Sequence, residues 1–388
     1  MKHLVLDVET TISNKGNPFD NTNRLCYVGL KSDIPFDSNL YDIEYSDNPF
    51  RNELTEIQAA IDSHELLIGF NIKFDLHWVR HYGITFSNKR IWDCQLVHFI
   101  LTGQKHSYPS LNDVAAYYGL GHKLDIVSTE YWKNGIDTPD IPVDILEEYL
   151  QGDLDLTYQV YLKQVAQVNQ MSPQFKRLVS LHNQDLLVLQ EMEYNGIVFD
   201  EKRSNEYAAK LEMDIAELDN ILYDYHSLDD FNPNSTDHLS ALLYGGSIKV
   251  KHREVIGVFK TGKRVGEPKE KWVETAVKFP RLVAPLKGSE LAKEGLYSTD
   301  EPTLRSLKGN KRAQELIELL LTRANLEKRL TTYYRGLVTL RKEMNWNEGR
   351  IHGQLNQCVV RTGRLSSSRP NLQNFDGQIK ELFGSRYG

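Results

Sequence analysis

Four acidic side chains stand in three short runs of the amino-terminal region: Asp7 and Glu9 in LVLDVETT, Asp75 in GFNIKFD, and Asp153 in YLQGD. Carboxylate oxygens are the ligands that hard divalent ions such as Mg²⁺ prefer. Two such ions, about 3.5–4 Å apart, can stabilise both the attacking and the leaving oxygen when a phosphodiester is hydrolysed. Without metal the same acids would repel one another and retain their protons. The residue types therefore predict a site for two Mg²⁺ ions, with Mn²⁺ as a substitute.

The local patterns predict elements that bring these acids together. Apolar residues alternate with Asp7 and Glu9, as in a strand that carries both acids on one face. The run LLIGF at 66–70 predicts a short buried strand, and the helical spacing that follows places Asp75 near a helix start.

A second helix is predicted from Pro142, with Tyr149 and Asp153 four residues apart on one face. A phenol beside a metal-bound water can orient that water for attack, which would give Tyr149 a catalytic role. Gly152 is costly inside a helix, so it suggests close packing or close approach of a substrate, with chance as an alternative. Two other acids have simpler interpretations. Asp155 lies on a different side of this helix, and Asp93 in IWDCQ caps the helix that follows it.

The order Asp-x-Glu, Asn-x-x-x-Asp, Tyr-x3-Asp resembles the tyrosine-containing branch of the DEDD exonuclease superfamily over residues 1–170. The resemblance implies a ribonuclease H-like mixed-sheet α/β domain that removes nucleotides from the 3′ end of nucleic acid. It implies that the four acids are metal ligands and that Tyr149 orients the water. It also implies that Thr10 and Asn71 touch the terminal nucleotide.

Whole-chain properties set the outer limits of the interpretation. A chain of 388 residues can build two or three cores, and its 40% hydrophobic content is that of an ordinary globular protein. The three cysteines, Cys26, Cys94 and Cys358, lack the paired spacing of a disulfide framework or a zinc site. No apolar run approaches the length of a membrane span, and Asp7 interrupts the only apolar start, so a cytoplasmic protein without a membrane partner is expected.

Charge is unevenly divided along the chain, whose net charge is −7. Residues 1–170 hold 13 Lys and Arg against 24 Asp and Glu, and the remainder holds 33 against 29. The first part is acidic, as a cation-binding region would be, and the rest is mildly basic. Affinity for phosphates would then come from local cationic clusters.

Beyond residue 170 helical periodicity dominates. A long helix closes at Asn195-Gly196, the run IVF predicts a short strand, and Asp200 can cap a second long helix. A third helix is expected over 311–343, with leucines at mixed spacings of three and four. Apolar stripes of this kind indicate core packing and no particular function.

Residues 246–300 interrupt the helices with many Gly, Pro and Lys, which predicts a few strands and long turns. We expect a solvated basic insertion, with contact to a DNA backbone as the alternative. Gly257-x4-Gly262-Lys263 imitates a phosphate-binding P-loop, but Arg264 stands where Ser or Thr would hold Mg²⁺. The P-loop interpretation is therefore rejected.

The run GRIHGQLNQCVVRTGRLSSSRPNLQN resembles the start of the palm in family A DNA polymerases. MEYNGIVFD, FNPNSTDHLSALLYGG and YSTDEPTLRSL resemble the thumb of that family, in the same order. The resemblance implies an exonuclease domain at 1–170, a mainly helical thumb at 171–345 and the beginning of a palm at 346–388. Its partners would be a single-stranded 3′ end and a primer-template duplex.

Four side chains in the palm-like run suit duplex binding without sequence reading. Arg364 can fork to acceptors in the minor groove, while the amides of Asn371, Gln373 and Asn374 supply uncharged donors to phosphates and sugars. The resemblance implies that Arg364 lies near the primer terminus and that the three amides lie along the primer-template backbone. Arg361 departs from the small residue expected before TGR.

The metal-binding D-Y-S-x-x-E-L-R and H-D-E runs of a family A polymerase do not occur in this sequence. FGSRYG near residue 388 is interpreted as the segment that leads to the first palm aspartate. We therefore expect a working 3′–5′ exonuclease that does not polymerise alone. Either a second polypeptide supplies the fingers and the remaining palm, as in a split polymerase, or the chain is a truncated product, and the sequence does not separate the two. The absence of a preceding 5′-nuclease region resembles phage enzymes. The alternatives are a trimming nuclease of the ribonuclease D type and a non-catalytic DNA-binding module.

Overall fold

The computed structural model describes residues 2–33, 36–46, 52–123, 125–347 and 349–385. Contacts divide the chain into two compact units, residues 1–201 with 338–388, and residues 202–337. Compactness thus groups the amino-terminal region with the carboxyl-terminal segment. The functional division into 1–170, 171–345 and 346–388 remains a prediction.

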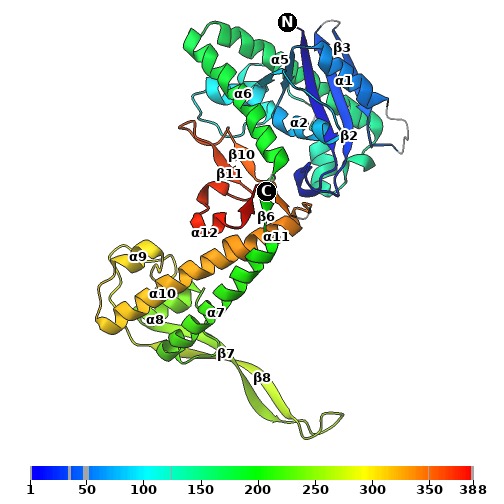
Figure 1. The fold of residues 1–388 in the computed structure, drawn as a ribbon. Helices are drawn as coiled ribbons and strands as arrows, with labels where there is room; N and C mark the ends of the chain where they lie inside the picture. Colours follow the sequence, from blue (N-terminus) through cyan, green and yellow to red (C-terminus); the bar gives the residue numbers. More distant parts are fainter. Residues whose placement is uncertain (1, 34–35, 47–51, 124, 348, 386–388) are drawn as a thin grey trace. The chain divides into compact units, whose positions relative to one another are not determined.

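The first unit is built on a five-stranded mixed sheet in the order β3-β2-β1-β4-β5 (Figure 1). Its strands are β1 (His3–Thr10), β2 (Leu25–Asp33), β3 (Phe36–Asp42), β4 (Leu66–Gly69) and β5 (Arg90–Asp93). Its helices are α1 (Glu53–Ser63), α2 (Ile72–His81), α3 (Cys94–Leu101), α4 (Leu111–Tyr117), α5 (Val143–Asn169) and α6 (Pro173–Asn195). Central β1 runs antiparallel to β2 and parallel to β4, so the mixed α/β sheet expected from the sequence is confirmed.

Hydrophobic cores cover both faces of β1. Leu4 and Leu6 belong to a core shared with α1 and α2, and Val5 belongs to a second core shared with α4 and α5. Because side chains alternate along a strand, Asp7 and Glu9 share the face of Val5. The strand therefore presents both acids towards the side that α5 covers.

Short strands of the carboxyl-terminal segment complete the first unit. They form a three-stranded sheet of β12 (Phe383–Gly384), β6 (Ile197–Phe199) and β9 (Arg350–Ile351), and a pair of β10 (Gln354–Asn356) with β11 (Ser366–Ser368). A short helix, α12 (Gly377–Lys380), precedes β12. The expected IVF strand is confirmed as β6, and the helix before it ends at Gly196 with φ +62°.

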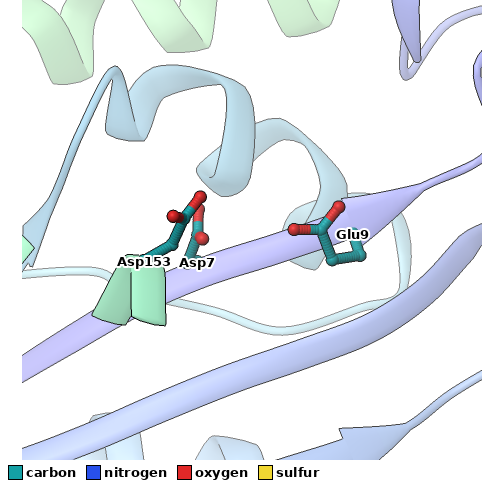
Figure 2. A group of neighbouring side chains, drawn as sticks. All are labelled: Asp7, Glu9 and Asp153. Atoms are coloured by element: carbon teal, nitrogen blue, oxygen red, sulfur yellow. The ribbon is translucent and has the colours of Figure 1, made fainter. Parts of the chain in front are cut away.

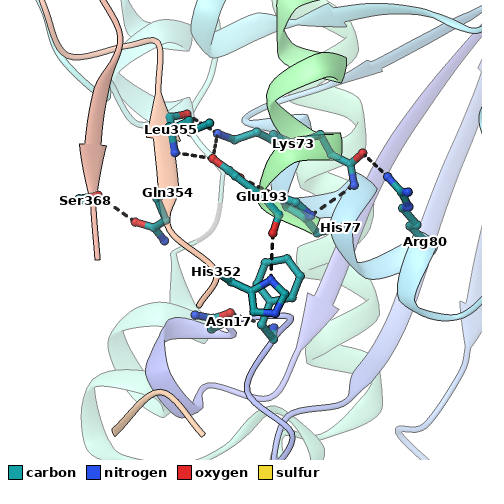
Figure 3. A network of polar contacts seen from close by, with 11 residues as sticks. Asn17, Lys73, His77, Arg80, Glu193, His352, Gln354, Leu355 and Ser368 are labelled. Atoms are coloured by element: carbon teal, nitrogen blue, oxygen red, sulfur yellow. Dashed lines mark hydrogen bonds and ion pairs between the residues drawn. The ribbon is translucent and has the colours of Figure 1, made fainter. Parts of the chain in front are cut away.

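A buried network around Glu193 fastens β10 to α2 and α6 (Figure 3). Lys73 Nζ donates to Glu193 Oε1 at 2.7 Å and to the Leu355 carbonyl at 2.6 Å. His77 Nε2 pairs with Glu193 Oε2 at 2.9 Å, and Gln190 approaches the other ring nitrogen at 3.2 Å. Burial keeps the pKa of His77 below its usual value, so the neutral ring donates through Nε2. Both Glu193 oxygens are therefore satisfied.

The second unit is mainly helical. Its elements are α7 (Glu201–His226), α8 (Thr236–Tyr244), β7 (Gly246–Val258), β8 (Pro268–Phe279), α9 (Glu301–Ser306), α10 (Lys311–Arg329), a π-helical turn (Leu330–Tyr334) and α11 (Arg335–Glu343), which crosses the unit border. The third long helix is thus confirmed, with the π-helical turn in its middle. No helix in the described part of the chain is long and apolar enough to cross a membrane.

The basic insertion forms an antiparallel hairpin of β7 and β8, as the alternation predicted. Gly257 lies in β7, and Gly262 lies in the turn that leads to β8. A strand-to-strand hairpin lacks the strand-to-helix loop that cradles phosphates in a P-loop. The structure therefore confirms the rejection of that motif.

Candidate active site

Close packing of α5 on the sheet brings carboxylates from distant parts of the chain together. Gly29 on β2 pairs with Asp7 on β1, and a Cβ at Gly29 would lie 2.9 Å from Leu154 Cδ1 on α5. Any larger residue there would push α5 away from the sheet. The glycine thus permits Asp153, which precedes Leu154, to approach Asp7.

Three of the four predicted metal ligands form one cluster. Ligand oxygens of Asp7, Glu9 and Asp153 all lie within 4.8 Å of one another. Figure 2 shows Asp153 coming from α5 to lie beside Asp7, with Glu9 farther along β1. Asp75 is not in this group, and its Oδ1 accepts the backbone N–H of Val8 at 3.0 Å. It nevertheless lines the same hollow as the other three acids.

Proton affinities in the cluster are strongly perturbed. Burial, reinforced by the charge of Asp153, raises the pKa of Asp7 to about 8. Burial and the charge of Asp7 likewise raise the pKa values of Glu9 and Asp75 well above their usual range. Burial also raises the pKa of Asp153, although Lys123 partly offsets this effect. A cluster that retains protons in this way lacks compensating positive charge.

Lys123 is the cation that the structure does place at the cluster. Its Nζ donates to Asp153 Oδ2 at 2.7 Å and to Tyr149 Oη at 2.6 Å, and it lies 4.4 Å from the centre of the Tyr149 ring. Its backbone N–H donates to Asn112 Oδ1 at 3.0 Å, which anchors the loop that carries it. The sequence reasoning missed Lys123, because a single lysine in a loop belongs to no motif or periodic pattern.

The unsatisfied acceptors fit a divalent ion. Asp153 Oδ1 is buried and has no hydrogen-bond partner among the described residues. An unpaired buried carboxylate oxygen costs free energy unless a cation or donor meets it. The set is made entirely of carboxylate oxygens, which suits Mg²⁺ or Mn²⁺. The residues present therefore fit the predicted metal ions.

A hollow of about 510 Å³ opens over the cluster, a size suited to a small ligand. The carboxylates and Tyr149 form one side, and Phe70, Phe74 and Trp132 contribute aromatic walls. Trp132 meets Tyr149 edge-on, with ring centres 5.8 Å apart. Its Nε1 donates to Thr138 Oγ1 at 3.1 Å, and that hydroxyl donates to the Thr10 carbonyl at 2.6 Å. Thr10 also lines this hollow, as a contact to a terminal nucleotide would require.

Asn71 and Asp93 lie at the start of α2. Asp93 caps α3 by accepting from Gln95 and Leu96, as predicted, and it also accepts from the backbone of Asn71 at 3.3 Å and Ile72 at 3.0 Å. It thus holds the helix that carries Asp75. Asn71 is exposed and lines a neighbouring hollow rather than the one above the carboxylates.

Asp155 and Gly152 are two further residues of α5 for which the sequence made predictions. Asp155 points away from the cluster and pairs with Lys31 at 2.8 Å, as expected for an acid on another side. No described atom lies within 4 Å of a Cβ built on Gly152. The packing explanation for Gly152 was therefore wrong, and the space beside it remains open.

The palm-like residues flank β11 in the same unit: Arg364 precedes the strand, and the other three lie in or beside the 3-10 helix Leu372–Asn374. Arg364, Asn371, Gln373 and Asn374 are all exposed. Asn371 Oδ1 accepts from the Gln373 backbone at 3.1 Å, and Gln373 Nε2 donates to the Leu365 carbonyl at 3.1 Å. Their DNA-binding roles remain predictions. The end of FGSRYG, residues 386–388, lies outside the described residues.

Comparisons with known proteins agree with the carboxyl-terminal resemblance. Residues 201–386 match the family model described as DNA polymerase family A. This part of the chain is similar to family A DNA polymerases. Across 81% of its length the whole chain is 28% identical to DNA polymerase I of Synechocystis, and across 83% it is 24% identical to the DNA polymerase of Bacillus phage SP01. These alignments span only 28% and 36% of the two relatives.

A solved structure is similar in fold to this chain. The POL domain of Pol1 from M. smegmatis, in complex with DNA primer-template and dNTP, superposes with a TM-score of 0.63 at 17% identity. The superposition covers 98% of this chain and 54% of that one. The mixed α/β architecture is therefore that of a polymerase POL domain.

Proposed function

We propose that the Asp7–Glu9–Asp153 cluster is the catalytic centre of a 3′–5′ proofreading exonuclease acting on DNA, within the amino-terminal part of a family A DNA polymerase. The observation that carries this proposal is the cluster of half-buried Asp7 with buried Glu9 and Asp153, in which one oxygen of Asp153 has no partner among the described residues. DNA is the proposed substrate because the relatives are DNA polymerases. We further propose that residues 171–345 and 346–388 act as thumb and palm segments that hold a primer-template.

Each side chain of the site has a proposed task. Asp7, Glu9 and Asp153 would hold two Mg²⁺ ions, with Asp75 as the fourth acid of the hollow. Bound ions of this kind stabilise the attacking and leaving oxygens of an in-line displacement. Burial and the neighbouring carboxylates raise the pKa of Tyr149, so its hydroxyl stays protonated and can hold the attacking water. Lys123 fixes that hydroxyl through its 2.6 Å hydrogen bond.

The aromatic walls would receive the terminal base. Phe74 and Trp132 offer flat apolar surfaces, and base–aromatic stacking does not depend on base identity. A proofreading enzyme must remove any of the four nucleotides, so this tolerance suits it. Thr10 and Asn71 would contact the terminal nucleotide from the two adjoining hollows.

The test is hydrolysis of 3′-labelled single-stranded DNA and RNA by the purified chain, with Mg²⁺ and with EDTA. We expect Mg²⁺-dependent release of 3′ deoxynucleotides and no release by an Asp7→Ala variant. A preference for RNA would support the ribonuclease D-type alternative. Binding of DNA without hydrolysis by the wild-type chain would support a non-catalytic module and contradict the proposal.

The palm assignment has its own test in the same assay. Arg364→Ala should weaken binding of a primer-template duplex while leaving single-strand hydrolysis nearly unchanged, because Arg364 is exposed and makes no contact with the carboxylates among the described residues. Equal losses in both measurements would contradict a role in duplex binding.

A further inference from the structure

The hairpin of β7 and β8 is a ribbon that extends beyond the core of the second unit. Ile248, Val250 and Phe279 are buried and anchor its base. Beyond them, every described side chain at 251–258 and 268–276 is exposed, except the half-buried Val273. Figure 1 shows the two strands running out together from α8. A two-stranded ribbon with both faces in water gains little stability from packing, so it offers a large unpartnered surface.

Positive charge is concentrated on this ribbon. Residues 246–279 contain nine Lys and Arg against four Glu, whereas the whole chain has a net charge of −7. Pairing across the hairpin places Lys249, Lys251 and Arg253 on one face, opposite Ala276, Glu274 and Trp272. Cations two residues apart on a strand are about 6.8 Å apart, twice the ~3.4 Å axial spacing of phosphates along one DNA strand. The row can therefore place one cation near every second phosphate along the helix axis.

These cations are available to a polyanion. Lys249 and Lys251 share Glu274 at 3.9 and 3.7 Å, and Arg253 meets Glu270 at 3.2 Å. Exposed ion pairs of this kind stabilise a fold only weakly, so exchanging them for phosphates costs little. Five other lysines of the ribbon, Lys260, Lys263, Lys269, Lys271 and Lys278, form no ion pair within the described part of the chain.

An exposed tryptophan lies opposite this row of cations, on the neighbouring strand. Trp272 is 59% exposed, and the Arg253 guanidinium lies 5.0 Å from the centre of one of its rings. Together with Arg264 and Lys271 they border a hollow of about 460 Å³ near the end of the ribbon. Cations beside a flat apolar surface suit a chain of sugars and phosphates.

We propose that the β7–β8 ribbon is a DNA-binding arm that lies along the phosphate backbone of duplex DNA, with Lys249, Lys251 and Arg253 as its central contacts. A two-stranded ribbon fits the major groove of B-DNA, and contacts to phosphates alone carry no sequence preference. The proposal takes DNA as the ligand from the proposed function, but it does not depend on the carboxylates. A single strand would instead call for a row of stacking platforms, whereas Trp272 is the one large aromatic on the ribbon that is mostly exposed among its described residues.

The experiment measures binding of the full chain to a fluorescent 30-base-pair duplex by anisotropy, in EDTA, across a series of NaCl concentrations. The test variant combines Lys249→Gln, Lys251→Gln and Arg253→Gln. A matched control removes the same charges from α5 and α6 through Lys163→Gln, Lys176→Gln and Arg177→Gln, all of them exposed positions. All six sites are at the surface, so both variants should fold.

We expect the ribbon variant to lose about tenfold or more in duplex affinity at 0.1 M NaCl. Its slope of log affinity against log salt should become shallower by about 2–3, since each phosphate contact contributes about 0.9. The control variant should stay within about twofold of wild type. Equal losses in both variants, an unchanged ribbon variant, or an equal loss with single-stranded DNA would each overturn the proposal. Because EDTA prevents hydrolysis, a failed exonuclease assay would leave this result interpretable.

Discussion

Two buried acidic sites in the first unit differ in how their charge is compensated. Glu193 receives Lys73 at 2.7 Å and His77 at 2.9 Å, and these partners hold its pKa below the usual value despite a burial effect that alone would raise it. In the cluster of Asp7, Glu9 and Asp153, Lys123 pairs with Asp153, and the pKa values of all three acids are nevertheless raised. A carboxylate with all its donors in place has a structural task. A cluster that lacks them is suited to bind cations from solution.

The largest effect should come from removing a charge at the uncompensated site. Asp153→Asn keeps the shape of the side chain but removes a ligand charge from the cluster, so release of 3′ nucleotides should fall at least ~10³-fold, about 4 kcal/mol of transition-state stabilisation. Single-turnover hydrolysis with excess enzyme measures this loss. Activity within tenfold of wild type would mean that the cluster does not carry the reaction.

The same acid-to-amide change at Glu193 should affect stability instead. Glu193→Gln leaves Lys73 and His77 without their anionic partner, and we expect a loss of about 2–3 kcal/mol in the free energy of unfolding. Asp153→Asn should cost less, because the lost ion pair with Lys123 is offset by relief of the repulsion from Asp7 and Glu9. Urea denaturation in EDTA measures both variants side by side. If Glu193→Gln and Asp153→Asn lost the same free energy of unfolding, the two sites would not differ in how their charge is compensated.

Replacing Lys123 tests what this lysine contributes to the reaction. Lys123→Met retains the aliphatic stem but loses the hydrogen bond to Tyr149, so kcat should fall by about 10–100-fold. Metal affinity should rise or stay constant, because a competing positive charge leaves the site. Tyr149→Phe should lower kcat similarly, and the two changes should not add if they disturb one contact. If the losses in kcat of the two single variants add fully in the double variant, Lys123 does not act through Tyr149.

The smallest expected effect is a pH dependence of stability. An acid whose pKa is higher in the folded than in the unfolded chain stabilises the fold below its unfolded value, about 3.9 for Asp, and this contribution disappears as pH rises through the folded value. The pKa of Asp7 is raised to about 8, so the metal-free protein should lose at least ~1 kcal/mol of stability between about pH 5 and 8. The difference between the melting temperatures in EDTA and in Mg²⁺ should therefore grow as pH rises. A constant difference over that range would argue against protonated acids in the cluster.

The elements around the cluster could be predicted because their signals are local. Alternation around Asp7 and Glu9 gave β1, and the i, i+4 spacing of Tyr149 and Asp153 gave one face of α5. Asp93 was correctly placed as a cap because capping depends on the next three residues.

Features that depend on distant partners were missed. Lys123 reaches Asp153 only because its loop is anchored to Asn112. Glu193 looked like one more acid on an amphipathic helix, yet its partner Lys73 lies 120 residues away. In the sequence Gly152 stands out because it precedes Asp153. It is Gly29 on β2, however, that permits the close packing of α5. Residue types alone do not reveal which tertiary contacts a side chain will meet.

Mn²⁺ binding, followed by electron paramagnetic resonance at pH 8, tests the central claim most directly. We predict that the wild-type chain and Glu193→Gln each take up about two ions, and that Asp7→Asn retains at most one weakly held ion. Equal uptake by Asp7→Asn and wild type, or no uptake by the wild-type chain, would contradict a metal centre at these carboxylates.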